Sequence, residues 1–170
     1  MPATVNANMR TVVHKTSNGM SIAFPDPCLT PAPPAPPVPI PYPNIAQSTD
    51  TAQGSTTVKA DGNPIMLQGS NFSQSTGDEA GSVGGVISAV TRGKAEFIMY
   101  SFDVMVDGKC VPRLGDLMLH NKGGTFNTPP TPEFQPPAIV VPIPEVPEIE
   151  AAQETRDWGL GAMSIVQGDA

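Results

Sequence analysis

Short runs of alternating apolar and polar residues, separated by turn residues, fill the first 125 residues of the chain. One run, Ser21–Phe24, follows the turn Ser17-Asn18-Gly19, and two others surround Asp61-Gly62 and Asp107-Gly108. Alternation with a period of two residues is typical of half-buried strands, and Asp-Gly between such runs favours a two-residue hairpin turn. The pattern therefore predicts a mainly β fold built from short hairpins, with little helix.

The two Asp-Gly hairpins resemble each other in sequence. The run "VKADGNPIML" begins at Val58 and the run "VMVDGKCVPRL" begins at Val104, 46 residues later. Five positions match in order, which favours an internal repeat in a small all-β fold, with chance similarity of two common turns as the alternative. The matched pairs are Val58 with Val104, Asp61 with Asp107, Gly62 with Gly108, Ile65 with Val111, and Gly69 with Gly115.

A proline tract interrupts this pattern, with ten prolines between residues 25 and 43. Proline has no backbone N–H and a fixed φ, so we expect residues 25–43 to form an unpaired polyproline II strap across the β domain. Recognition of the tract by an aromatic groove on a partner is the alternative.

A second tract holds eight prolines in residues 129–147, together with apolar residues that are unusual in a plain spacer. We therefore expect a domain over residues 1–125 and a proline-rich C-terminal arm over residues 126–170. The arm contains Trp158 and a short helix predicted around Glu148–Asp157. We expect this arm to dock an effector, a toxin or an adaptor protein.

Composition and charge narrow the classes of function. The chain has 170 residues, a formal net charge of −7, and nine Lys and Arg residues that are scattered singly. Nucleic-acid binders need clustered cations, so we expect no nucleic-acid partner. The sequence has no long apolar run typical of a membrane span, and its N-terminus lacks the apolar region of a signal peptide. We therefore expect synthesis in a cytoplasm and no stable membrane insertion.

The pattern Arg113-x-Gly115-Asp116-x-x-x-His120 resembles the signature of PAAR-repeat proteins, although Cys110-Val111-Pro112 replaces their Pro-Ala-Ala. The wider chain is similar to the PAAR-like family found beside type VI secretion genes and polymorphic toxins. This similarity runs from about His14 to Lys122. It includes the segments "NGMSIAFPDPCLTPAP", "PVPIPYPNIAQS", "DGNPIMLQGSNFSQSTGDEAG", "GKAEFIMYSFDV" and "LMLHN".

The resemblance implies a small cone-shaped β fold that caps the VgrG spike trimer of a type VI secretion system. It further implies that the protein sharpens the spike, helps to load or deliver effectors, and can hold a structural zinc ion. We therefore expect a structural protein with no enzymatic activity. It would lie in the bacterial cytoplasm before firing and be secreted into a target cell or the medium afterwards.

The candidate zinc ligands are the two histidines and two cysteines of the chain, His14, Cys28, Cys110 and His120. Two cysteines and two histidines form a closed tetrahedral zinc site of the structural kind, although their spacings here differ from those of zinc fingers. Cys110 is the weakest candidate, because it stands where the PAAR pattern has proline. A small buried apolar residue is the alternative role of Cys110, and an exposed polar residue is that of His14.

An enzymatic alternative uses the same residues. In a small zinc-dependent hydrolase or toxin module, His14, His120 and a cysteine would bind zinc and Asp116 would act as a base. The preferred role of Asp116 is structural, because Asp after Gly often binds nearby backbone amides, with Arg113 bridging carbonyls or a carboxylate. The acidic segment Thr76–Gly81 is expected to be a solvated loop.

Overall fold

The computed structural model describes residues 3–137, and these residues belong to the first of two units, Met1–Ala138 and Ile139–Ala170. The greater part of the predicted arm, with Trp158 and the predicted helix, lies outside the described residues. The described part is mainly β, as predicted, and contains no helix long and apolar enough to cross a membrane. Its strands are β1 (Asn6–Ala7), β2 (Arg10–Thr11), β3 (Met20–Ala32), β4 (Ala35–Gln47), β5 (Thr51–Ala52), β6 (Lys59–Ala60), β7 (Asn63–Pro64), β8 (Asn71–Phe72), β9 (Ser75–Thr76), β10 (Gly84–Gly85), β11 (Lys94–Phe97), β12 (Met105–Val106), β13 (Lys109–Cys110), β14 (Leu117–Lys122) and β15 (Thr131–Phe134), and a 3-10 turn spans Ser48–Asp50.

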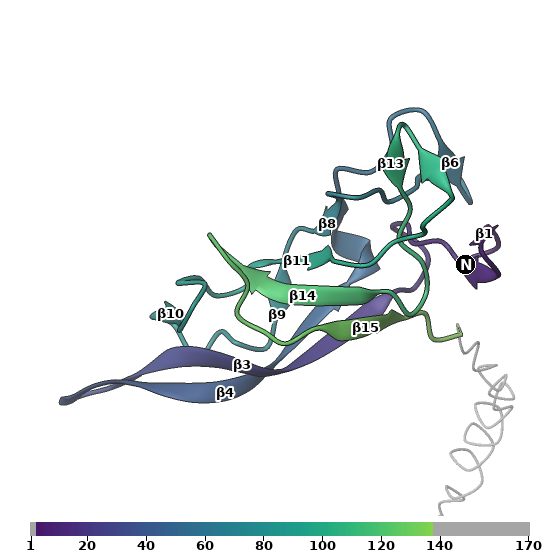
Figure 1. Ribbon diagram of the computed structural model, residues 1–170. Helices are drawn as coiled ribbons and strands as arrows, with labels where there is room; N and C mark the ends of the chain where they lie inside the picture. The colour runs from purple at the N-terminus through teal and green to yellow at the C-terminus, as the bar shows by residue number, and fades with distance from the viewer. Residues whose placement is uncertain (1–2, 138–170) are drawn as a thin grey trace, which may run out of the picture. The chain divides into compact units, whose positions relative to one another are not determined.

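The main sheet has the strand order β5-β8-β11-β14-β15-β3-β4-β9, with β10 paired to β3. Three two-stranded hairpins stand beside it: β1–β2, β6–β7 and β12–β13. Figure 1 shows β1, β6 and β13 at one end of the described unit and the tip of the long β3–β4 hairpin at the opposite end. Strand β15 belongs to the predicted C-terminal arm, residues 126–170, and it pairs with β14 and β3 of the predicted domain. The boundary between domain and arm at residue 125 remains a prediction.

The expectation of an unpaired polyproline strap over residues 25–43 is wrong. Eight of the ten prolines lie in β3 and β4, which form one antiparallel hairpin with Pro27 opposite Pro41 and Cys28 opposite Ile40. Opposed residues in such a hairpin alternate between hydrogen-bonded and non-hydrogen-bonded pairs. A pair of prolines has no N–H to share, so Pro27 and Pro41 form a non-hydrogen-bonded pair and their neighbours carry the ladder.

The proline spacing explains why this hairpin can form. Because Pro39 and Pro41 are two residues apart, their backbone nitrogens lie on the same edge of β4. This edge faces away from β3, so the hairpin needs no N–H there. On β3, the outward carbonyl of Pro27 accepts a hydrogen bond from Val86 N at 2.9 Å. Proline in sheets is confined to such outward positions, and the sequence shows this as proline at alternate positions.

The three small hairpins are copies of one unit, where the sequence indicated two. Their two-residue turns are Asn8-Met9, Asp61-Gly62 and Asp107-Gly108, and every turn residue has a positive φ between 48° and 79°. In each copy, a residue seven positions after a valine donates its backbone N–H to the carbonyl of that valine. These bonds join Val12 to Val5 at 3.0 Å, Ile65 to Val58 at 3.3 Å and Val111 to Val104 at 3.3 Å.

Two apolar clusters support this architecture. The first lies among the three hairpins and contains Ala7, Val12, Ala60, Ile65, Leu67 and Val111. The second lies among the strands of the sheet and contains Val13, Ala46, Met66, Phe72, Ala95, Phe97 and Met118. Within it, the rings of Phe72 and Phe97 meet edge to face, with 5.9 Å between their centroids. The hairpins therefore have a core of their own, distinct from that of the sheet.

Candidate functional site

The three hairpins form a closed ring, because the first residue of each turn binds the segment that precedes another hairpin. Asn8 Nδ2 donates to Asp103 Oδ1 at 2.7 Å, and Asp61 Oδ2 accepts the backbone N–H of Thr4 at 2.9 Å. Asp107 accepts the hydroxyls of Ser55 and Thr57. The partners Thr4, Thr57 and Asp103 each lie four residues before the turn of their own copy. We call this assembly, residues 4–17, 55–70 and 101–116, the three-hairpin ring.

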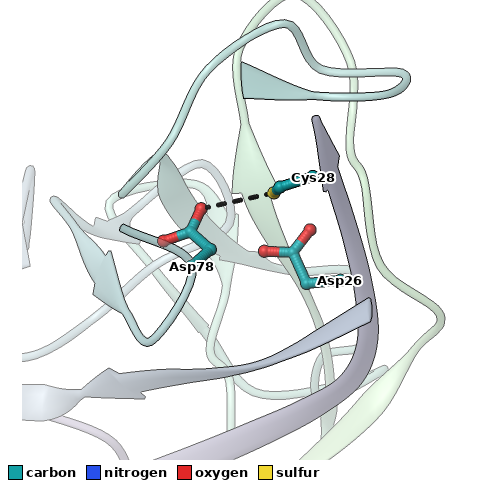
Figure 2. Close-up of side chains that lie close together, drawn as sticks. All are labelled: Asp26, Cys28 and Asp78. Atoms are coloured by element: carbon teal, nitrogen blue, oxygen red, sulfur yellow. Dashed lines mark hydrogen bonds between the residues drawn. The ribbon is translucent and has the colours of Figure 1, made fainter. Parts of the chain in front are cut away.

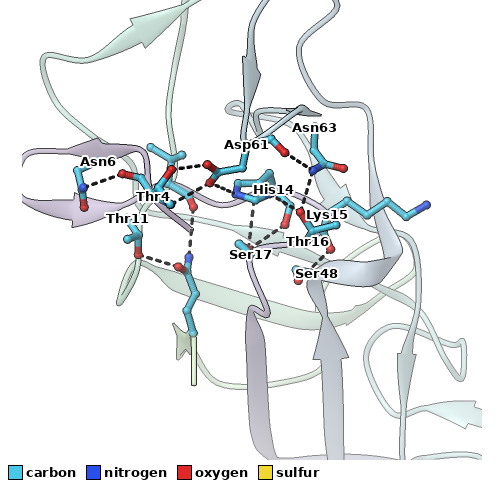
Figure 3. A network of polar contacts seen from close by, with 12 residues as sticks. Thr4, Asn6, Thr11, His14, Lys15, Thr16, Ser17, Ser48, Asp61 and Asn63 are labelled. Atoms are coloured by element: carbon cyan, nitrogen blue, oxygen red, sulfur yellow. Dashed lines mark hydrogen bonds and ion pairs between the residues drawn. The ribbon is translucent and has the colours of Figure 1, made fainter. Parts of the chain in front are cut away.

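A second set of contacts crosses two of these junctions, from the ends of the first and third copies. Figure 3 shows the junction of the first and second copies, where His14 Nε2 lies 3.0 Å from Asp61 Oδ2. At the equivalent position of the third copy, Arg113 Nη1 donates to Asn8 Oδ1 at 2.8 Å. The second copy has Leu67 at this position, and it packs in the apolar cluster of the hairpins. His14 is therefore buried as a structural link in the ring.

The Arg-x-Gly-Asp motif is one of three equivalent turns at the exits of the hairpins. Asp116 Oδ2 accepts the backbone N–H of Arg113 at 2.8 Å, as Ser17 Oγ does for His14 at 3.3 Å and Ser70 Oγ does for Leu67 at 2.9 Å. The Asp116 carboxylate also pairs with the guanidinium groups of Arg113 and Arg10. These contacts agree with the structural role predicted for Arg113 and Asp116.

A second polar site lies where the loop after β9 meets β3. Asp26 and Cys28 project from the same side of β3, and Asp78 approaches them from the loop (Figure 2). All three side chains are fully buried, and their potential ligand atoms lie within 4.8 Å of one another. The loop is held tightly, because a Cβ on Gly81 would lie only 2.2 Å from the Cβ of Cys28.

Hydrogen-bond donors surround the two carboxylates of this site. Asp26 accepts the side-chain amides of Asn44, Asn121 and Asn127, with Asn44 Nδ2 at 2.7 Å from Oδ2. Asp78 accepts the backbone N–H of Arg92 at 3.0 Å. Buried carboxylates need such partners, since an unpaired buried charge is costly. The donors hold both carboxylates in place beside Cys28.

The donor set fits a divalent metal ion with three protein ligands. Burial, and then the charges of Asp26 and Asp78, raise the pKa of the Cys28 thiol to about 12, and burial raises the pKa of Asp78. Without a cation the thiol therefore stays protonated and points toward Asp78 Oδ2, 3.8 Å away. Zinc binds carboxylate and thiolate ligands, and its binding would displace the thiol proton. The full burial of these ligands separates them from any polymeric substrate.

The structure does not bring the four predicted zinc ligands together. Among residues 3–137, Asp26, Cys28 and Asp78 are the only group of three or more His, Cys, Asp or Glu side chains with ligand atoms this close. Of the predicted set, only Cys28 belongs to it. His14 lies in the ring, and Cys110 is partly exposed on β13.

His120 is enclosed in the sheet. Its Nε2 lies 3.0 Å from Ser21 Oγ and its Nδ1 lies 3.2 Å from Asn44 Oδ1. Burial lowers the pKa of His120 to about 4, so its imidazole is neutral at physiological pH. A neutral imidazole with both nitrogens hydrogen-bonded has a structural role in β14.

Asp26 and Asp78 were missed by the sequence analysis. Asp78 belongs to the segment Thr76–Gly81, which was expected to be solvated, but its side chain is fully buried. One signal was available: Asp26 and Cys28 are two residues apart, so in a strand they share a face. The partner Asp78 gives no comparable local signal.

Glu133 on β15 is a further buried group. Its carboxylate oxygens have no hydrogen-bond partner among the described residues, and burial raises its pKa to about 8. Gly19 lies directly against it, because a Cβ at Gly19 would lie 2.1 Å from Glu133 Oε1. Glu133 is therefore mainly protonated at neutral pH.

Comparison with known proteins gives one curated relative, the DNase toxin Tse7 of Pseudomonas aeruginosa. The two sequences are 41% identical over 136 residues, which cover 75% of this chain and 35% of Tse7. The chain thus spans about a third of the length of this relative. No solved structure matches the chain.

This relative corrects one expectation. We expected a protein with no enzymatic activity, but the relative is named as a toxin that acts on DNA, so that expectation is wrong. The coarser expectation of an effector or spike-tip role associated with type VI secretion is supported. Residues 19–130 match the family described as the toxin PAAR-like domain, which is more than half of the chain. The chain belongs to the toxin PAAR-like domain family.

Proposed function

We propose that the three-hairpin ring caps the VgrG spike trimer of a type VI secretion system and helps to deliver a toxin. The observation that carries this proposal is the ring of three equivalent turns, each tied to a neighbouring copy. A trimer presents the same surface three times around its axis. A cap made of one chain can match that surface by repeating a similar unit three times.

The orientation of the unit supports the same function. The ring lies at one end of the described unit and the tip of the β3–β4 hairpin lies at the other (Figure 1). With the ring on the trimer, this hairpin would point away from the spike. Its tip contains Pro31, Pro33, Pro34, Pro36 and Pro37, which limit the backbone freedom of the hairpin.

The test is the stoichiometry of the complex formed by the full chain and its cognate VgrG trimer, measured by light scattering after gel filtration. We expect one chain per trimer. Three chains per trimer, or no complex at micromolar concentration, would contradict the cap.

We also propose that the protein is a toxin with nuclease activity, which would replace the expectation of no nucleic-acid partner. This proposal rests on the relative's name and on the shared family. Purified protein should degrade plasmid DNA in the presence of a divalent metal ion. Intact plasmid under these conditions would exclude the nuclease and leave the spike proposal standing. The fully buried Asp26, Cys28 and Asp78 are proposed to bind a structural zinc ion that stabilises the loop against β3.

The proposed role of residues 126–170 is the docking of an effector or adaptor protein. Because β15 is part of the sheet, the informative deletion begins at residue 138 and leaves Thr131–Phe134 in place. Removal of residues 138–170 should preserve binding to VgrG and abolish co-purification with the effector. Unchanged co-purification would rule out the docking role.

A further inference from the structure

The three copies of the ring differ in the side chains that they expose at equivalent positions. The first turn ends in Met9, where the other two end in Gly62 and Gly108. The residue five positions before the first turn residue is Phe102 in the third copy, Thr56 in the second and Ala3 in the first. Met9 is 97% exposed and Phe102 is 83% exposed.

These two apolar side chains stand at a single junction. Asn8, beside Met9, binds Asp103, beside Phe102, with 2.7 Å between Asn8 Nδ2 and Asp103 Oδ1. Met105, on the next strand of the third copy, is 56% exposed. At the equivalent junction of the second and third copies, the corresponding residues are Thr56, Lys59 and Gly108. The ring is therefore apolar at one junction and mainly polar at this other one.

The backbone at Met9 gives a second, independent observation. Met9 has φ of +63°, in the left-handed region where residues with a Cβ are strained and where the other two copies have glycine. Strained residues of this kind gather at functional sites. Because Met9 is almost fully exposed, its side chain cannot compensate for this strain by burial within the unit.

We infer that the junction of the first and third copies, with Met9, Phe102 and Met105, is the apolar anchor through which the ring binds its threefold partner. This inference rests on the proposed function. The partner carries an apolar pocket on each of its three equivalent chains, and the anchor of the ring fills one of these pockets. Large exposed aromatic and methionine side chains are suited to this role, since a few such residues supply most of the energy of an interface.

The asymmetry gives the experiment its control. Phe102→Asp and Thr56→Asp place the same charge at equivalent positions of the third and second copies. The affinity of each full-length variant for the cognate VgrG trimer is measured by surface plasmon resonance. Phe102→Asp should raise Kd at least thirtyfold, which corresponds to the ~2 kcal/mol of an interface hot spot. Thr56→Asp should raise it less than threefold.

Met9→Gly is a second variant, which separates binding from folding. It should weaken binding at least fivefold while its thermal midpoint stays equal to that of the wild type or rises. Equal effects of the Phe102 and Thr56 substitutions, or unchanged binding by Phe102→Asp, would overturn the anchor. If the wild-type chain itself does not bind the trimer, the proposed cap fails, and the anchor fails with it.

Discussion

Arg113 Nη1 donates a hydrogen bond to Asn8 Oδ1 at 2.8 Å, although 105 residues separate the two in the sequence. This contact closes the ring, because it joins the third copy to the first. Arg113 also donates to the Asp116 carboxylate and to the backbone carbonyl of Tyr100. One side chain thus connects the signature motif, the first turn and the segment before the third hairpin.

We expect Arg113→Leu to lower the free energy of unfolding by about 3–5 kcal/mol, since it leaves the buried Asp116 carboxylate with Arg10 as its one remaining cationic partner. Urea denaturation at pH 7 measures this loss. Arg92→Leu is the control, because Arg92 is half exposed and lies 3.7 Å from Glu79, so its loss should be about 1 kcal/mol or less. Equal losses in the two variants would show that the ring is not closed through Arg113.

The three turns predict opposite effects at equivalent positions. Met9→Gly removes strain at a positive φ and should stabilise the protein by about 0.5–1 kcal/mol. Gly62→Ala, at a φ of 79° with open space around its Cβ, should destabilise it by about 1 kcal/mol through strain alone. Thermal unfolding of both variants checks the pair, and stabilisation by Gly62→Ala would contradict the equivalence of the turns.

Glu133 predicts a decrease of stability with rising pH. Its folded pKa of about 8 exceeds the ordinary value of 4.5, so the folded state holds the proton more tightly. The contribution of the protonated form is complete below pH 4.5 and is lost progressively as the pH rises toward 8. Glu133→Gln should remove this loss and should be more stable than the wild type at pH 8, by on the order of 3 kcal/mol.

The measurement is the difference in unfolding free energy between wild type and Glu133→Gln at pH 5 and pH 8, which cancels the titration of the other groups. A difference that is the same at pH 5 and pH 8 would mean that Glu133 is solvated in the folded protein.

Gly19 and Glu133 should be energetically coupled. Gly19→Ala forces a methyl group against Glu133 Oε1 and should cost about 1–3 kcal/mol. In the Glu133→Ala background the carboxylate is absent, so the same substitution should cost much less. A double-mutant cycle in urea measures the coupling, and simple additivity would show that the two residues do not touch.

The proposed zinc site predicts different roles for the two cysteines. Cys28→Ser should reduce the zinc content of purified protein, measured by mass spectrometry of the metal, from about one ion per chain to a small fraction. Cys110→Ser should leave it unchanged, because Cys110 is partly exposed and lies outside the Asp26–Cys28–Asp78 group. Chelation should lower the thermal midpoint of the wild type and not that of Cys28→Ser. Equal zinc content in all three proteins would reject the site.

Local sequence determined the features that depend on neighbours along the chain. The Asp-Gly turns and the alternation around them predicted the second and third hairpins, because a two-residue turn with positive φ fixes the pairing of its own flanks. The Arg113–Asp116 turn was predictable for the same reason, since its hydrogen bond spans three residues. The first hairpin escaped detection because Asn8-Met9 lacks the glycine that marks the other two turns.

Tertiary structure decided what depends on distant partners. Prolines 25–43 pair as a hairpin because Pro27 and Pro41 meet in a register where neither needs an N–H, and no short window of sequence contains that register. Asp78 is buried because its loop packs against β3, fifty residues earlier in the chain. The four predicted zinc ligands share a suitable chemistry, but their separation in space is set by the ring and the sheet. Residue type gave the chemistry, and long-range packing decided which side chains meet.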